Sequence, residues 1–397
     1  MKRLFALLLA AMLLLSLIGC GDAGTPEPPI RDEPVLDEPS PDELAEQQRL
    51  AELARRAQEL EDRLASMTLA EKVGQLFFLR CPSSGAEAAV AQHHLGGILL
   101  FTQDYKDASG NWLTQDAFAE KLAALQDAAE SDTGIPLLIG SDEEGGTVTR
   151  ASRNPNLFPS KFPSPQSLFE TVGLEGLLAD TQQYNSRLHS LGITVNFAPV
   201  CDVSTNPKDF IYERSFGQNA QTTADYIAQV VAAMSDAGIA SVLKHFPGYG
   251  SNADTHTGIA VDERPYEQFL AEDYLPFAAG IGAGAPFVLV SHNIVTCLDS
   301  SYPASLSAAW HEQLRSHLGF EGVILTDDLD MGAVKAYADG GNIAVLALQA
   351  GNDMIVCSDL TQIGAVIAAV QDGTLSEKTI DSACRRVLAA KQSLLLI

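Results

Sequence analysis

The chain has 397 residues and a formal net charge of −26; 46% of its residues are hydrophobic and 19% are charged. This length fits two or three ordinary domains, or one α/β barrel with extensions. The acidic balance argues against a nucleic-acid partner, because phosphate binding requires clustered Lys and Arg. It also argues against direct adsorption to an anionic membrane surface.

The N-terminus predicts an export signal that ends in a lipidation site. Lys2 and Arg3 precede an apolar run over residues 4–15, which is too short and too early for a membrane span. The sequence LIGC at residues 17–20 resembles a bacterial lipobox. We therefore predict a signal peptide over residues 1–19, lipidation of Cys20, and an extracytoplasmic protein held by a lipid anchor in the bacterial cell membrane. A signal anchor with an incidental cysteine is the alternative.

A tether and a helix are predicted between the signal and the globular part. Residues 20–41 are rich in proline and acidic side chains and have too little apolar surface to fold, which is typical of an extended tether. Residues 42–66 carry leucines near helical spacing, at positions 44, 50, 53, 60 and 64. This spacing predicts a helix that packs against other elements.

The chain then alternates short apolar runs with helix-like stretches. The runs cover residues 75–79, 97–101, 136–141, 194–200, 241–245, 287–291, 322–326 and 354–357. Uninterrupted apolar runs of this length are typical of parallel strands covered by helices on the outside. Eight such units predict a (β/α)8 TIM barrel as the single catalytic domain, over residues 67–397. A doubly wound open sheet is the alternative, but no glycine-rich phosphate motif follows an early run.

Polar residues cluster at the C-terminal ends of these runs. They are Asp142, Asp202, Lys244 with His245, His292 and Asp327. In a (β/α)8 barrel these ends meet at one rim, where active sites are built. The pattern therefore predicts a catalytic or binding rim, although single residues of this kind also serve as helix caps or core ion pairs.

The segment KHFPGYGSNADTHTG over residues 244–258 combines a strand end with a loop that cannot be helical. Asp254 and His256 are two positions apart, so in an extended stretch their side chains point the same way. A carboxylate placed there can hold one imidazole nitrogen and orient the other as an acid or base. The alternative is a loop-capping Asp beside a solvent-exposed His.

The segment GVILTDDLDM over residues 322–331 ends a strand with two adjacent acids. An inward-pointing carboxylate at Asp327 could be a nucleophile on an anomeric carbon. We expect Asp328 to be the N-cap of the following helix.

These two segments resemble glycoside hydrolase family 3, in its single-barrel β-N-acetylhexosaminidase branch. Six further segments, over residues 67–76, 142–150, 196–203, 213–217, 303–307 and 350–354, are similar to family motifs and occur in the same order. The resemblance covers residues 65–397. It implies a carbohydrate substrate that contains N-acetylglucosamine, and neither a cofactor nor a metal.

The resemblance also implies a role for each matching residue. Asp327 would be the catalytic nucleophile and His256 the acid/base, with Asp254 orienting it. The sugar hydroxyls would be held by Asp142, Arg150, Arg214, Lys244 and His245. The implied reaction is retaining hydrolysis of a terminal, non-reducing N-acetylglucosamine from peptidoglycan fragments or chito-oligosaccharides.

Two residues depart from the family pattern, and several functions stay open. Tyr249 stands where the family usually has His, and Thr147 where it often has Arg. A phosphorylase or β-glucosidase of the same family, a metal-dependent barrel hydrolase and a non-catalytic wall-binding lipoprotein are the alternatives. Larger members of the family, such as β-glucosidases, carry a second α/β domain that supplies the acid/base; all the motifs found here belong to the barrel. We expect a monomer.

The cysteines predict neither a disulfide framework nor a metal site. Without Cys20 five remain, which is an odd number, and none lies in a CxxC or zinc-like spacing.

Overall fold

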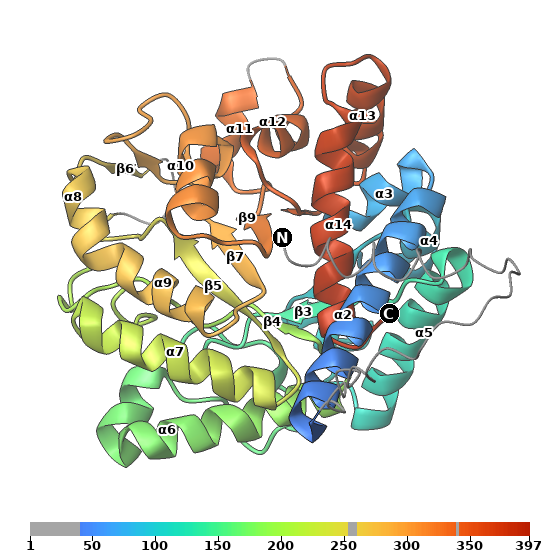
Figure 1. The fold of residues 1–397 in the computed structure, drawn as a ribbon. Helices are drawn as coiled ribbons and strands as arrows, with labels where there is room; N and C mark the ends of the chain where they lie inside the picture. The colour runs from blue at the N-terminus through green and yellow to red at the C-terminus, as the bar shows by residue number, and fades with distance from the viewer. Residues whose placement is uncertain (1–39, 253–259, 339–340) are drawn as a thin grey trace, which may run out of the picture. The chain divides into compact units, whose positions relative to one another are not determined.

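The computed structural model describes residues 40–252, 260–338 and 341–397 (Figure 1). The chain divides into two compact units, residues 1–54 and residues 55–397. Helix α2 (Pro41–Ser66) begins in the first unit and ends in the second. In the first unit, the Glu43 carboxylate accepts a hydrogen bond from the Ser40 backbone N–H at 2.8 Å, and the Ser40 hydroxyl accepts one from the Glu43 N–H at 3.3 Å. This reciprocal pair satisfies N–H groups that the start of a helix leaves without partners.

The second unit is built around an eight-stranded parallel sheet. Its strands are β1 (Phe77–Arg80), β2 (Gly97–Leu100), β3 (Leu138–Ser141), β4 (Val195–Asn196), β5 (Ala240–Phe246), β7 (Phe287–Val290), β9 (Val323–Thr326) and β10 (Ile355–Cys357). They are arranged in the order β10-β1-β2-β3-β4-β5-β7-β9. A parallel bridge between Leu325 and Met354 joins β9 to the segment entering β10, and the Thr326 N–H donates to the Met354 carbonyl at 3.1 Å. The sheet is therefore a barrel, and each of its strands overlaps one of the eight predicted apolar runs.

Side chains fill the inside of the barrel. Phe78 of β1 and Phe197 beyond β4 meet edge to face, with ring centroids 5.2 Å apart. Gly140 of β3 faces this pair: a Cβ built on it would lie 2.7 Å from the Phe78 ring and 2.8 Å from the Phe197 ring. The residue is glycine because two aromatic rings already occupy the space, so the barrel is a packed core and not a pore.

Helices follow the strands and surround the barrel (Figure 1). The main ones are α3 (Leu69–Gln75), α4 (Ala86–His93), α5 (Gln115–Thr133), α6 (Pro165–Ser190), α7 (Ala220–Asp236), α9 (Tyr274–Gly282), α10 (Ala308–Glu312), α12 (Ile343–Ala350), α13 (Thr361–Gln371) and α14 (Glu377–Ser393). Short helices α8 (Tyr266–Gln268) and α11 (Gly332–Lys335) and several single helical turns lie in the loops. Several helices begin at a side-chain cap; Thr68, for example, forms a capping box with Glu71 at the start of α3.

A second, two-stranded parallel sheet was not predicted from the sequence. It pairs β6 (Val261–Asp262) with β8 (Ile294–Val295), which belong to the loops after β5 and β7. Each strand has two residues, too few for the periodicity of the sequence to reveal.

Lys391 of α14 joins three segments near the N-terminal ends of the strands. Its amine donates to the Gln75 side-chain oxygen and to the Pro136 carbonyl, both at 2.7 Å. Burial lowers the pKa of the Lys391 amine to about 7. The face at the N-terminal ends of the strands stabilises a (β/α)8 barrel, whereas the loops at the opposite face build the active site.

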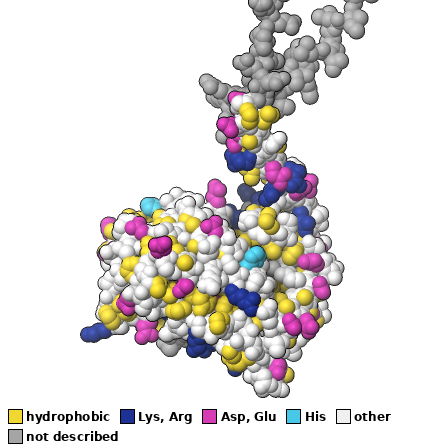
Figure 2. Space-filling view, turned by 90° about the horizontal axis from the view of Figure 1, so that it is seen from below, with side chains coloured by type: hydrophobic (Ala, Val, Ile, Leu, Met, Phe, Trp, Pro, Cys, Tyr) yellow, Lys and Arg dark blue, Asp and Glu magenta, His cyan; other side chains and the backbone are white. Residues whose placement is uncertain are grey.

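Three further features concern the part of the chain that the structure describes. None of its helices is long and apolar enough to cross a membrane. Cys81, Cys201, Cys297, Cys357 and Cys384 are unpaired thiols. Acidic side chains are scattered over the face shown in Figure 2 and do not form one patch.

Candidate active site

A pocket opens at the C-terminal ends of the barrel strands. Its walls are formed by Arg80, Leu99, Phe101, Asp142, Glu144, Val148, Arg150, Phe197, Arg214, Lys244, His245, Leu289, Asp327, Asp328, Met331 and Val356. These residues come from, or directly follow, β1, β2, β3, β4, β5, β7, β9 and β10, or belong to the loops after β3, β4 and β9. The predicted rim is therefore a real concave site, and Asp142, Arg150, Arg214, Lys244, His245 and Asp327 all line it.

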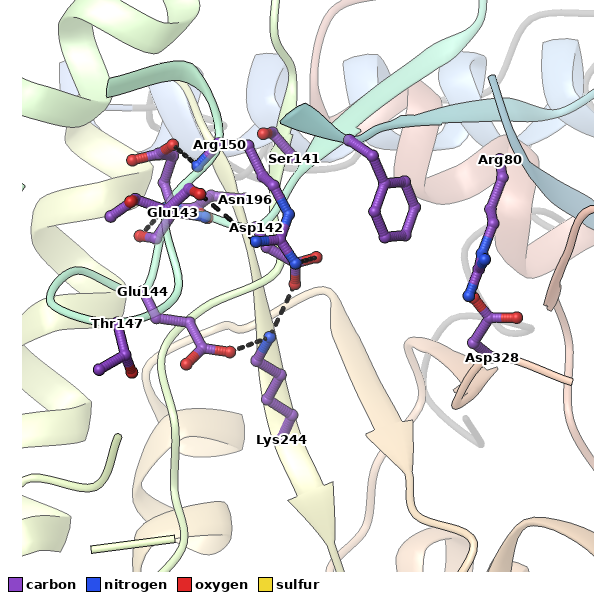
Figure 3. Close-up of polar contacts among 12 residues, drawn as sticks. Arg80, Ser141, Asp142, Glu143, Glu144, Thr147, Arg150, Asn196, Lys244 and Asp328 are labelled. Carbon is purple, nitrogen blue, oxygen red and sulfur yellow. Dashed lines mark hydrogen bonds and ion pairs between the residues drawn. The ribbon is translucent and has the colours of Figure 1, made fainter. Parts of the chain in front are cut away.

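Lys244 lies at the centre of a buried ion cluster. Its amine is 2.9 Å from Asp142 Oδ1 and 2.6 Å from Glu144 Oε1. Figure 3 shows Lys244 in contact with both carboxylates. Burial by itself lowers the pKa of the Lys244 amine, but the Asp142 and Glu144 carboxylates outweigh it and raise the pKa above its usual value. Lys244 therefore stays protonated and holds the two carboxylates at a fixed separation.

Glu144 is bound from a second side by Arg214. Arg214 Nε and Nη2 lie 2.9 Å and 2.7 Å from the two carboxylate oxygens, a bidentate pair. Burial opposes the ionised form of Glu144, but the Arg214 and Lys244 cations hold the pKa of this carboxyl well below its usual range. Glu144 is thus a fixed negative charge that orients two cations toward the pocket.

His245 is oriented by Asp202, which lies behind it. His245 Nδ1 is 2.7 Å from Asp202 Oδ2, and His245 Nε2 is 3.1 Å from Arg214 Nη2. Because an arginine can only donate, Nε2 accepts and the proton of a neutral ring resides on Nδ1, where it donates to Asp202. Asp202 is buried and does not line the pocket, so it positions His245 from behind.

Arg150 reaches the pocket from the loop after β3. Its guanidinium is 3.6 Å from Asp142 Oδ2, a looser contact than that of Lys244. The loop is held by the buried Glu143 side chain, which accepts hydrogen bonds from the backbone N–H groups of Arg150 and Ser152. Burial raises the pKa of Glu143 to about 7, against the lowering effect of these hydrogen bonds.

Both acids after β9 line the pocket, and Asp328 is not a helix cap. Helix α11 begins at Gly332 and Met331 occupies its N-cap position. Asp328 instead forms an ion pair with Arg80 at the end of β1, while its backbone N–H donates to Asp327 Oδ1 at 2.8 Å. The cap prediction is wrong because five residues, 327–331, separate the end of β9 from the start of α11; in this segment the Asp328 carboxylate accepts from the Asp330 N–H at 2.9 Å.

His292 is at a strand end but does not line the pocket. It is buried, with Nδ1 2.7 Å from Ser305 Oγ and Nε2 3.0 Å from the Asp328 carbonyl oxygen. Its ring therefore supports the segment that carries Asp327.

The two departures from the family pattern have different surroundings. Tyr249 is buried, its ring centroid is 5.7 Å from that of His245, and its N–H donates to Asp202 Oδ1 at 2.7 Å. It is thus a neighbour of a pocket residue, packed behind His245. Thr147 is exposed, and its carbonyl accepts from Arg153 at 3.2 Å.

Three predicted residues lie outside the described part of the chain. They are Asp254 and His256, in the loop after β5, and Cys20 near the N-terminus. Their predicted roles stay predictions. Among the described residues, no group of three or more His, Cys, Asp or Glu side chains is arranged to hold a metal ion.

Glu144, Arg80 and Phe101 line the pocket but were not predicted as site residues from the sequence. Glu144 had a signal: it is two positions after Asp142, the same spacing that paired Asp254 with His256. Arg80 directly follows the first predicted run, so it also stands at a strand end. The Arg80 and Arg150 guanidiniums lie 4.8 Å and 5.5 Å from the centroid of the Phe101 ring, an arrangement that depends on contacts between strands and has no local signal.

A (β/α)8 barrel with paired carboxylates and cations at its C-terminal rim defines a class of enzymes that includes many glycoside hydrolases. The model of the glycosyl hydrolase family 3 N-terminal domain matches residues 68–390. The chain belongs to glycosyl hydrolase family 3, as its motifs predicted.

Relatives with known names and structures agree with this assignment. The β-hexosaminidase LpqI of Mycobacterium tuberculosis is 31% identical over 335 residues, which is 81% of this chain and 82% of LpqI. The β-N-acetylhexosaminidase structure from Beutenbergia cavernae is 32% identical with a TM-score of 0.71, covering 83% of this chain and 99% of that chain. A family 3 β-N-acetylglucosaminidase structure from Paenibacillus is 30% identical with a TM-score of 0.74; the match covers 83% of this chain but 63% of that longer one.

Proposed function

We propose that the protein is a retaining exo-β-N-acetylhexosaminidase that removes terminal, non-reducing N-acetylglucosamine. The observation that carries the proposal is the meeting of Asp327 with Asp142, Arg150, Arg214, Lys244 and His245 in one pocket. The names of the relatives, β-hexosaminidase and β-N-acetylhexosaminidase, support the choice of sugar.

The polar wall of the pocket is suited to the hydroxyl groups of one sugar ring. The carboxylates of Asp142 and Glu144 are acceptors, and the cations of Lys244, Arg150 and Arg214 are donors. Because these groups hold one another in place before substrate arrives, little side-chain entropy is lost when the sugar binds. A preorganised polar wall can fix the ring with its anomeric carbon toward Asp327.

The proposed reaction has two steps. The Asp327 carboxylate attacks the anomeric carbon and forms a glycosyl ester, while protonated His256 gives its proton to the departing oxygen. Water then attacks the anomeric carbon as His256 takes a proton from the water, which breaks the bond to Asp327, releases the sugar with retained configuration and regenerates the Asp327 carboxylate. Asp254 would orient His256 throughout.

Membership of the family specifies neither the natural substrate nor the location of the protein, and both are proposed here. We infer that peptidoglycan fragments are the main substrates and chito-oligosaccharides the second. A lipid anchor at Cys20, followed by the acidic tether, would hold the enzyme outside the cytoplasm where such material occurs; the predicted lipobox supports this.

The test is hydrolysis of a chromogenic N-acetylglucosaminide by the purified protein and by its Asp327→Asn variant, with and without phosphate. We expect N-acetylglucosamine as the product in both buffers and a loss of about 10⁴-fold or more in kcat for the variant. Equal activity of the variant would contradict the role of Asp327. Sugar 1-phosphate as the main product in phosphate would identify a phosphorylase instead.

A further inference from the structure

Arg80 and Asp328 form an ion pair on the pocket wall that none of the proposed roles includes. Arg80 ends β1, and Asp328 follows β9; in the barrel β10 lies between these two strands. Both Nε and Nη2 of Arg80 contact Asp328 Oδ2. In Figure 3 the pair stands apart from the cluster around Lys244. It is therefore a separate charged unit of the same pocket.

This pair is connected directly to the carboxylate of Asp327. The Asp328 backbone N–H donates to Asp327 Oδ1 at 2.8 Å, so a shift of the Asp328 backbone changes that hydrogen bond. The Asp328 carbonyl accepts from His292 Nε2 at 3.0 Å, and the Asp327 N–H donates to the Val290 carbonyl at 3.0 Å. The backbone is thus held by β7 and its loop, and the Asp328 side chain is held by Arg80.

The Arg80–Asp328 ion pair determines how much negative charge stands beside Asp327. The Asp328 side chain is 10% exposed and that of Arg80 36%. Arg80, Asp327, Asp330, His292 and Cys357 surround Asp328. Besides Arg80 and Asp328, the charged or titratable groups that share the pocket with Asp327 are Asp142, Glu144, Arg150, Arg214, Lys244 and His245. Burial raises the pKa of Asp328 to about 6 even though Arg80 lowers it, so at neutral pH the Asp328 carboxylate is ionised beside Asp327 and Arg80 compensates its charge.

We propose that Arg80 is a positioning residue for Asp327, acting through Asp328. It neutralises the charge that stands next to Asp327 and holds Asp328 so that its N–H stays on the Asp327 carboxylate. This inference rests on the proposed role of Asp327 as nucleophile. A nucleophilic carboxylate must be ionised, and an uncompensated negative neighbour would favour its protonated form.

The test is the pH dependence of kcat/KM between about pH 4 and 9 for Arg80→Met and Asp328→Asn, because this profile reports the ionisations of the unbound enzyme. Arg80→Met removes a positive charge, so the acid limb should move up by about 0.5 to 1 pH unit. Asp328→Asn removes a negative charge, so the limb should move down by a similar amount, and the double variant should lie between the two. We also expect Arg80→Met to lower kcat about ten-fold or more.

Two controls separate positioning from a simple loss of structure. Arg80→Lys keeps the charge but not the paired geometry, so the acid limb should stay in place while kcat is partly restored. Arg153→Met removes an arginine from the loop after β3 outside the pocket lining, and should leave the limb unchanged.

Acid limbs that do not move, or that move in the same direction in both single variants, would overturn the inference. If Arg80→Met does not fold, the downward shift in Asp328→Asn, which preserves side-chain shape, decides the question. The proposed function is tested separately by Asp327→Asn. If this variant is active, Asp327 is not the nucleophile. If it is inactive and the acid limbs of Arg80→Met and Asp328→Asn do not move, only the role of Arg80 is refuted.

Discussion

At the scale of single residues, the pocket depends on charges that are buried together. Lys244, Glu144 and Arg214 are each expensive to remove from water, and their contacts of 2.6 Å and 2.7 Å compensate that cost. Such a cluster adds little to the free energy of unfolding, since apolar residues that fill the same volume would stabilise the fold about as well. Its clearer consequence is a fixed arrangement of donors and acceptors facing the pocket.

Replacement of Lys244 by Met should therefore damage activity and stability together. The variant leaves Asp142 with the looser 3.6 Å contact to Arg150, and Glu144 with Arg214 as its cation. We expect kcat/KM to fall about 100-fold or more. Because one partner of a buried ion cluster is lost, the free energy of unfolding should fall by up to about 3–5 kcal/mol, measured by urea denaturation at pH 7. Lys208→Met, at an exposed position in the loop after β4, is the matched control and should change neither.

Glu143 should make stability depend on pH. Its pKa in the folded protein is about 7, above the value of 4.5 for an unperturbed glutamic acid, because the side chain is buried. The folded state therefore binds the proton more tightly, and the stabilising contribution is fully present below about pH 4.5 and is lost as the pH rises through about 7. Glu143→Gln keeps an oxygen acceptor for the Arg150 and Ser152 N–H groups and cannot ionise.

We thus expect Glu143→Gln to be more stable than the parent protein at pH 8 by about 1–3 kcal/mol, with a much smaller difference at pH 5. Urea denaturation at the two pH values measures this. A difference that is the same at both would show that Glu143 is ionised throughout.

The pocket residues that could be predicted from the sequence are mainly those at the ends of strands. Asp142, Lys244 and Asp327 could be placed at one rim because parallel strands of a barrel share a direction. Which cation meets which carboxylate could not be predicted, because Lys244 and Glu144 are 100 positions apart in the chain and meet through tertiary structure.

At the scale of elements, helix α2 changes its environment along its length. Leu60 and Leu64 are buried in the hydrophobic core of the 55–397 unit, whereas Leu44, Leu50 and Leu53 are 44%, 52% and 51% exposed. The leucine spacing predicted one packing helix over residues 42–66, and the helix is present, but its apolar stripe is buried only over the last turns. Periodicity shows which side chains share a face and not how far along the helix that face is covered.

Leu64→Ala should accordingly destabilise the 55–397 unit. Leu64 is 4% exposed, and deleting its buried methyl groups leaves a cavity, so we expect a loss of about 2–4 kcal/mol. Val172→Ala in α6, at a residue that is 51% exposed, is the matched control and should cost less than about 0.5 kcal/mol. Thermal and urea unfolding measure both, and a loss below about 1 kcal/mol for Leu64→Ala would contradict the packing seen here.

At the scale of the whole molecule, the repeating pattern of the chain was sufficient to predict the architecture. Eight apolar runs, each continuous rather than alternating, predicted a parallel barrel, and the eight strands are paired in that way. The β6–β8 sheet and the Arg80–Asp328 pair were missed, because they depend on loops and on strands that are not neighbours in the chain. The net charge of −26 does not describe the pocket, where Arg80, Arg150, Arg214 and Lys244 are balanced by carboxylates.

The most direct test of the central claim is to trap the covalent intermediate. The enzyme would be incubated with a 2-acetamido-5-fluoro glycosyl donor, digested, and mapped by peptide mass spectrometry. A fluorinated sugar slows both steps by destabilising positive charge at the anomeric carbon, and a good leaving group restores the first, so the ester accumulates. We expect one label, on the Asp327 side chain; a label on another residue, or no label in an enzyme that turns the donor over, would contradict the role of Asp327 as nucleophile.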